Sequence, residues 1–315
     1  MPTPNTVVST IPNISQSTAI SIFSWVLIFL TPALWSVNYL VARTAPSFVA
    51  PHMLAVTRWG LAALLLGIFA WPELKAKRHL IWVERWHCLA LGVLGMWVCG
   101  AWVYIGARTT SANNIALIYA LSPVFIALAA ALFLKEHLRK RQWFGVVVAL
   151  LGLVHVVIQG HWQAIAQTEF VAGDAWILGC AIAWAIYSIL LKRWPSQFSP
   201  LARLVLIAAA GALFTLPLAL LESTSSMMAN QTVWGWTTVC IVVGAAVFPS
   251  SGAYLAYATL QKRIGAARTA LVLYLGPLYA AAVGWFALGE PLHIYHAIGA
   301  LIILPGIYLA SQNQE

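Results

Sequence analysis

Apolar residues fill this chain in long stretches, and polar and charged positions are gathered between them. From residue 21 to residue 311, these stretches are long enough to cross a hydrocarbon core of about 30 Å as helices. Lipid offers backbone N–H and C=O groups no hydrogen-bond partners, so we expect helices throughout. The pattern predicts ten spanning helices, near residues 21–43, 51–71, 86–107, 112–134, 142–159, 174–191, 200–221, 235–259, 266–288 and 293–311.

The composition agrees with an all-α integral membrane protein. Of 315 residues, 62% are hydrophobic and only 8% are charged, more apolar surface than a soluble protein could cover. The four cysteines lie singly on apolar segments, without a CxxC or Cys/His grouping. No Walker A loop, HExxH or GxSxG motif is present. We therefore predict no metal, no cofactor and no enzymatic activity.

The net charge of +9 reports topology rather than nucleic-acid binding, because the cations lie in short clusters between apolar stretches. With the N-terminus in the cytoplasm, 14 of the 17 Lys and Arg residues lie at the inner side. This bias predicts both termini in the cytoplasm and insertion in the cytoplasmic (inner) membrane. Residues 1–20 lack the basic region of a signal peptide, so we expect a flexible tail.

A two-helix unit occurs twice, in residues 121–152 and again in residues 275–306. Because each half has five helices, an odd number, the second half must cross the membrane inverted, as in secondary transporters. We expect a first repeat at 21–159, a connecting outer loop at 160–173 and a second repeat at 174–311, around a central cavity. The matched pairs are Pro123/Pro277, Glu136/Glu290, Leu138/Leu292, Gly145/Gly299 and Gly152/Gly306.

The opening helix of each half also repeats, with a face of Trp and hydrogen-bonding side chains. Trp35 and Trp184 lie in the middle of their segments, which favours a cavity over an interfacial aromatic belt; the belt remains an alternative. The matched residues are Trp35, Asn38, Tyr39 and Arg43 in the first half and Trp184, Tyr187, Ser188 and Lys192 in the second.

These features together resemble the drug/metabolite transporter superfamily, in its ten-helix, two-repeat EamA form. The resemblance rests on the opening helix, Arg58 and the duplicated Pro…Glu…Gly…Gly unit, and it covers about residues 25–311. It implies a central cavity and export of amino acids or other small metabolites.

Candidate cavity residues follow from the prolines and from aromatic or hydroxyl side chains on helix faces. Each proline deprives a carbonyl one turn back, near Tyr119 or Leu273, of its helical partner. These carbonyls could line the cavity, or the kinks could only improve packing. The cavity candidates are Trp35, Asn38, Tyr39, Arg58, Trp97, Tyr104, Tyr119, Ser122, Pro123, Trp184, Tyr187, Tyr254, Tyr257, Tyr274 and Pro277.

Three charged residues have two readings each. Arg58 lies inside a helix and could receive a substrate carboxylate, or it could reach outward and bond to backbone carbonyls. Glu136 and Glu290 end helices 4 and 9. They could gate the pathway, or they could accept backbone N–H groups at the start of the next helix.

The sequence therefore predicts a secondary transporter that exports a small metabolite by alternating access, an amino acid or a related carboxylate-bearing solute. We expect it to act as a monomer, with the solute and membrane lipid as its partners and no nucleic acid. A multidrug exporter of organic cations is the alternative, although no acidic residue falls in the middle of a helix. An alternative from a different class of function is a membrane-embedded enzyme or sensor.

Overall fold

The computed structural model describes residues 21–136, 138–166, 168–224 and 232–311, so the predicted tail at 1–20 lies outside the described residues. The described residues hold ten helices long and apolar enough to span a membrane, and no strand. The all-α, ten-helix prediction is confirmed. Six spans are single helices: α1 (Ile22–Thr44), α2 (Pro51–Ala76), α7 (Lys140–Val157), α8 (Ala172–Arg193), α9 (Pro200–Thr224) and α14 (Ile294–Ser311).

Four spans are interrupted, and they are the third and fourth of each half. The third and eighth contain π-helical segments, and the fourth and ninth are broken just before a proline. The third consists of α3 (Arg78–Gly92), a π-helix (Val93–Trp102) and α4 (Val103–Gly106), and the fourth of α5 (Ala112–Ala120) and α6 (Ser122–Phe133). The eighth consists of α10 (Trp236–Ala245), a π-helix (Ala246–Ala253) and α11 (Tyr254–Ile264), and the ninth of α12 (Ala266–Ala270), a 3-10 segment (Leu271–Leu275) and α13 (Gly276–Leu288).

The third span begins at Arg78, well before the predicted residue 86. Its first turns are helical because they pack on the α8–α9 connection. Leu80 is buried with Phe198, and the carboxylate of Glu84 accepts hydrogen bonds from Ser196 Oγ (2.6 Å) and Gln197 N (3.2 Å). Hydropathy alone did not predict this segment, because it contains polar side chains. One of them, Glu84, is satisfied by hydrogen bonds that no local pattern shows.

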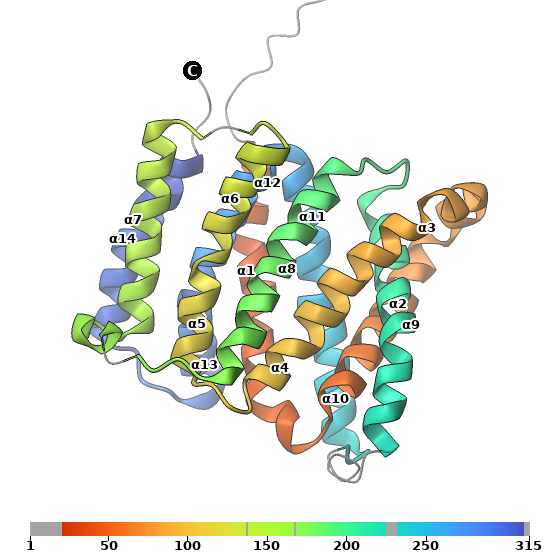
Figure 1. The fold of residues 1–315 in the computed structure, drawn as a ribbon, viewed down its shortest axis with the longest axis horizontal. Coiled ribbons are helices and arrows are strands. Elements are labelled where there is room, and N and C mark those ends of the chain that lie inside the picture. The colour runs from red at the N-terminus through yellow and green to blue at the C-terminus, as the bar shows by residue number, and fades with distance from the viewer. Residues whose placement is uncertain (1–20, 137, 167, 225–231, 312–315) are drawn as a thin grey trace, which may run out of the picture.

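The two halves pair helix by helix. Figure 1 shows α7 beside α14 at one edge of the bundle and α2 beside α9 at the other. Each pair joins the same helix of the two repeats. Within each pair the helices run in opposite directions, which is the inverted arrangement that the odd helix number predicts.

The repeated glycines explain the α7–α14 pair. A Cβ on Gly145 would lie 2.6 Å from the backbone of Gly306 and Ala310, and a Cβ on Gly306 would lie 2.6 Å from Ala149 N. Glycine at both positions lets the two backbones touch, as small residues do between membrane helices.

The two ends of the bundle differ in charge. The connections after α2, α6, α8 and α11 lie at the end where both described termini also lie, at the top of Figure 1. They carry Lys77, Arg139, Arg193 and Arg263 among other cations, and we call this the basic end. The opposite end holds the α4–α5, α7–α8 and α13–α14 connections.

Candidate functional site

The two repeat prolines break their spans in the middle of the bundle. Pro123 and Pro277 each occupy the first turn of a new helix, α6 and α13. Tyr119 and Leu273, the residues one turn back, line the same internal pocket. The predicted link between the prolines and an internal cavity therefore has a geometric basis.

This pocket, the deep pocket, has a volume of about 300 Å³ and draws its walls from both halves of the chain. Its lining is mostly apolar and aromatic, as in sites for small organic ligands. It is lined by Trp35, Asn38, Arg58, Cys99, Ala116, Tyr119, Ala120, Leu153, Trp184, Pro249, Tyr254, Leu273, Gly276 and Pro277.

Trp35, Trp184 and Tyr254 line the deep pocket, and Tyr187 and Tyr257 pack behind them; these five residues form an aromatic cluster. The rings of Trp35 and Trp184 meet edge to face at 5.5 Å, so the opening helices of the two halves touch through their equivalent residues. Trp184 also stacks on Tyr187 at 5.1 Å and contacts Tyr257 at 5.1 Å. Such geometries are favourable for aromatic pairs and hold the rings in place.

Arg58 brings a positive charge to the deep pocket. Its side chain is only 5% exposed. Its Nη1 donates to Asn38 Oδ1 (3.3 Å) and to the hydroxyl of Tyr104 (3.4 Å), and its guanidinium carbon lies 5.1 Å from the ring centre of Trp59. No carboxylate of the described residues lies within ion-pair distance of Arg58. The charge is therefore held by neutral groups.

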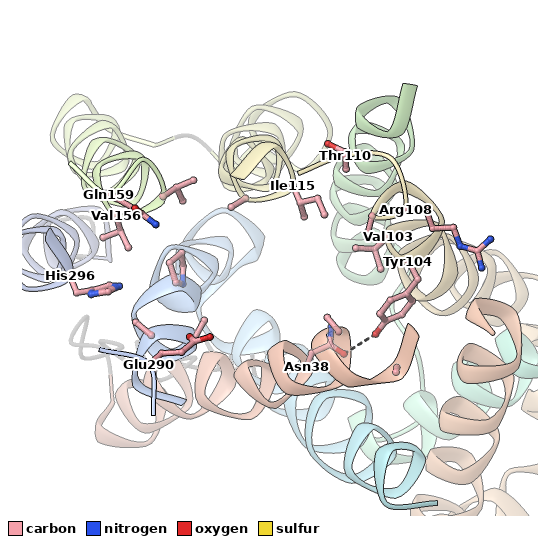
Figure 2. Close-up of a pocket in the computed structure, with 18 of the residues that line it drawn as sticks. Asn38, Val103, Tyr104, Arg108, Thr110, Ile115, Val156, Gln159, Glu290 and His296 are labelled. Carbon is pink, nitrogen blue, oxygen red and sulfur yellow. Dashed lines mark hydrogen bonds between the residues drawn. The ribbon is translucent and has the colours of Figure 1, made fainter. Parts of the chain in front are cut away.

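The deep pocket adjoins a wider vestibule of about 1080 Å³ at the opposite end. Asn38, Ala116 and Pro277 line both spaces and form the neck between them. Figure 2 shows the hydrogen bond from the Tyr104 hydroxyl to Asn38 Oδ1 (3.2 Å) beside this neck. A solute that approached Arg58 from the opposite end would have to pass these three residues.

At the basic end Glu136 joins the two repeats. The Oε2 atom of Glu136 accepts from the backbone N–H groups of Ala266 (2.9 Å) and Ala267 (3.3 Å), at the start of α12. Gly265 precedes them with a φ of 87°, and a Cβ there would lie 2.8 Å from Oε2, so glycine suits both the conformation and the close approach.

Glu136 thus accepts N–H groups at the start of a helix, but this helix is not the next one along the chain, as the hypothesis had it. The contact is to the ninth span rather than to α7, because α6 packs against α12 across the two repeats. The helix that follows Glu290, α14, begins at Ile294. Glu290 and Pro291 line the vestibule.

The remaining predicted residues occupy other places. Tyr187 and Tyr257 are each 1% exposed within the aromatic cluster, and the Tyr257 hydroxyl bonds to Ser188 Oγ (3.0 Å). Ser122, Pro123 and Tyr274 are buried beside the pathway without lining the deep pocket or the vestibule. The side chain of Tyr39 lies outside what the structure describes.

Trp97 does not line the deep pocket or the vestibule. It packs on Phe214 (5.1 Å between ring centres) and Trp102 (5.6 Å). Gly100, three residues further on, lies against Trp59 and Arg58. The π-helix Val93–Trp102 has more residues per turn than an α-helix, so residues three apart no longer share a face.

Sequence reasoning missed Cys99 and Pro249, which both line the deep pocket. Pro249 could have been found, because a proline in the middle of an apolar segment signals a broken or distorted helix. For Cys99, no feature of the sequence indicated that it lines a pocket. Among the described residues, no group of three or more His, Cys, Asp or Glu side chains could hold a metal ion.

Comparisons with known proteins agree with this geometry. The family model "EamA-like transporter family" matches residues 22–158 and 171–312. The uncharacterized transporter YyaM of Bacillus subtilis is 28% identical over 271 residues, covering 86% of this chain and 88% of the relative.

Two other matches bear on function and fold. A protein of Streptantibioticus cattleyicolor named "Probable terminal-alkyne amino-acid exporter" is 24% identical over 303 residues, covering 90% of this chain and 95% of the relative. A crystal structure with 20% identity superposes with a TM-score of 0.73, covering 91% of this chain and 96% of the other, and shows the shared fold.

Proposed function

Because this chain belongs to the EamA-like transporter family, we propose that it exports a small carboxylate-bearing metabolite, an amino acid or a close relative, by alternating access. One observation supports the solute class above the others. A buried guanidinium, that of Arg58, lines the deep pocket beside Asn38, and no carboxylate of the described residues lies within ion-pair distance of it.

A buried charge is costly unless it is paired or has a function. Hydrogen bonds to Asn38 and Tyr104 hold the guanidinium but do not neutralise it. A solute carboxylate would neutralise it and could bond to it through two N–H groups. The aromatic and apolar walls would then cover the rest of the solute.

The orientation of the chain in the membrane would follow from the charge bias. The basic end would face the cytoplasm under the positive-inside rule, with both termini inside and the vestibule facing outward. The conformation would then be outward-open. We expect the cytoplasmic membrane to be the site of action and one chain to suffice, since both halves of the same chain line the deep pocket.

The amino-acid exporter of Streptantibioticus cattleyicolor supports this solute class by similarity. An exporter of organic cations fits the site less well, because the formal charge that the described residues bring to the deep pocket is that of Arg58. A cation would meet repulsion there rather than a counter-ion.

Flux through the purified protein tests the proposal. Proteoliposomes loaded with a panel of unlabelled amino acids should take up a labelled member of the panel by exchange. Arg58→Gln should reduce this exchange about tenfold to 100-fold, because hydrogen bonds between charged groups contribute about 1.5–3 kcal/mol. Wild-type exchange in that variant, or no exchange with any amino acid, would contradict the proposal.

Orientation has its own test. Reporter fusions after Lys77, Arg141, Arg193 and Arg263 should report a cytoplasmic location, and a fusion within 160–166 should report an external one. A cytoplasmic signal from the latter fusion would contradict the assignment of the ends.

A further inference from the structure

Two buried N–H groups of the deep pocket have no partner. Arg58 Nε and Trp184 Nε1 make no hydrogen bond with the described residues, and their side chains are 5% and 6% exposed. Both residues line the deep pocket. Each nitrogen can only donate a hydrogen bond, and a buried donor without an acceptor is unfavourable. The deep pocket therefore suits a ligand that brings acceptor atoms.

The acceptors next to these donors are already in use. Asn38 Oδ1 accepts from both Arg58 and Tyr104. The carbonyl of Leu273, next to the Pro277 break, accepts from Gly276 N. Both lone pairs of Asn38 Oδ1 are therefore in use, and the carbonyl oxygen of Leu273 already has one partner.

The positions of the carboxylates also favour a ligand that brings acceptor atoms. The described carboxylates lie away from the deep pocket: Glu136 bonds to the start of α12, and Glu290 lines the vestibule. The other described acids are in spans near their ends or in a connection: Glu73, Glu84, Glu169, Asp174 and Glu222. An α-ammonium in the deep pocket would face Arg58 and no carboxylate of the described lining.

Building on the proposed function, we infer that the deep pocket recognises the carboxylate of its solute and not the α-ammonium group. Arg58 and the Trp184 N–H would both donate to the carboxylate oxygens. The substrate class would then extend beyond amino acids to monocarboxylates without an amino group, such as 2-oxo acids and alkyl or aryl carboxylates. The pocket volume of about 300 Å³ suits an apolar tail of modest size.

Matched sets of three ligands separate the two groups of an amino acid. The sets are alanine, propanoate and ethylamine; leucine, 4-methylpentanoate and 3-methylbutylamine; and phenylalanine, 3-phenylpropanoate and 2-phenylethylamine. Dissociation constants would be measured by calorimetry on the purified full chain in detergent. Binding avoids the passive leak of weak acids that complicates flux.

For the best-bound tail, the amino acid and its deaminated carboxylate should bind within about threefold of each other, a difference under 1 kcal/mol. The amine should bind at least tenfold more weakly. Binding of the amino acid with the carboxylate tenfold weaker would overturn the inference and leave the proposed function standing. Equal or tighter binding of the amine would overturn both, and so would the absence of binding by every ligand.

Two variants test the donors. Trp184→Phe keeps most of the ring but removes the N–H, and should weaken both carboxylates about tenfold, because a hydrogen bond to a charged acceptor is lost. Arg58→Lys keeps the charge but removes Nε, and should weaken them at least as much. Neither variant should change the dissociation constant of the amine by more than about twofold.

Trp102→Phe is the matched control, since Trp102 lies outside the deep pocket and the vestibule and packs on Trp97 and Trp176. It should bind all ligands as the wild type does. Size-exclusion profiles identify folded variants. If folded Trp184→Phe binds the carboxylates with unchanged affinity, Trp184 is not a donor and the two-donor arrangement is wrong.

Discussion

The two ends of the pathway are built from equivalent helices and yet differ in conformation. At the opposite end, the vestibule of about 1080 Å³ leads through the Asn38 neck to the deep pocket. Toward the basic end, Tyr187 of the aromatic cluster lines a separate, smaller pocket of about 220 Å³ together with Lys192 and Arg203. At the same end Glu136 bonds to the start of α12. An inverted repeat that adopts two conformations at once is what alternating access between two states requires.

The matched glutamates show this asymmetry most directly. Glu136 bonds to the first N–H groups of α12, which joins the first repeat to the second at the basic end. Glu290, its equivalent, lines the open vestibule; Figure 2 shows it across that space from Thr110 and Ile115, near the start of α5. Glu136 therefore holds the two repeats together at the basic end, whereas Glu290 lines the vestibule at the opposite end.

The largest expected effect comes from filling the neck. Ala116 lines both the vestibule and the deep pocket, so Ala116→Trp should obstruct the path between them. We expect exchange in proteoliposomes to fall by about 100-fold or more, the equivalent of about 2.7 kcal/mol of lost binding. Leu132→Trp, at a position 76% exposed on α6, is the control and should transport normally. Normal exchange by a folded Ala116→Trp would show that solute does not pass this neck.

The aromatic cluster should give the next largest effect. Removing the ring of Trp35 or Trp184 loses contact area worth about 1–3 kcal/mol, so flux per folded molecule should fall about tenfold to 100-fold in Trp35→Ala and Trp184→Ala. Trp82→Ala, on α3 and 72% exposed, is the control. Near-wild-type flux in both cluster variants would place these rings outside the pathway.

The cluster also shows what the sequence could predict. The internal repeat aligned Trp35 with Trp184, and the structure brings these two rings into contact at 5.5 Å. The repeat prolines likewise pointed to Tyr119 and Leu273, which both line the deep pocket. Each prediction rests on a local rule, helical periodicity or the missing proline N–H, applied twice. The carbonyl of Leu273 is not left free, however, because it accepts from Gly276 N.

Other features depend on contacts between distant segments. Trp97 was expected in the cavity because an α-helical period was assumed through the π-helix. The partner of Glu136 is 130 residues away in sequence, so no local pattern could name it. The same holds for Gly145 and Gly306, whose role is the close approach of α7 and α14.

A smaller effect should follow from releasing the closed end. Glu136→Gln removes the charge at the start of α12, an interaction worth about 0.5–2 kcal/mol, and should shift the population toward opening at the basic end. In a background without the natural cysteines, labelling of Leu191→Cys, in the smaller pocket, by a thiol reagent added to the basic side should speed up about threefold or more.

Two other glutamates provide control variants for this labelling experiment. Glu290→Gln should not speed up this labelling, because Glu290 lines the vestibule at the opposite end. Glu169→Gln, at an exposed connection, should also leave it unchanged. Unaltered labelling in Glu136→Gln, with only a lower melting temperature, would mean that Glu136 stabilises the fold without holding the end closed.

The smallest effect should come from the proton gradient. Neither end of the pathway presents a carboxylate to the deep pocket among the described residues, and an embedded carboxylate is the usual carrier of a coupling proton. Exchange flux should therefore change less than about twofold when a protonophore collapses the pH gradient, a difference below 0.5 kcal/mol.

His155 is the remaining candidate for a group that carries a coupling proton. Its buried Nε2 has no partner among the described residues, and its ring lies 6.0 Å from that of Trp162 near the opposite end. If flux vanishes with the gradient, His155→Gln should reproduce the loss without a protonophore. If that variant still responds to the gradient, the proton must bind at another group, and the vestibule glutamate, Glu290, would be the next to replace because it is the described carboxylate that faces the open path.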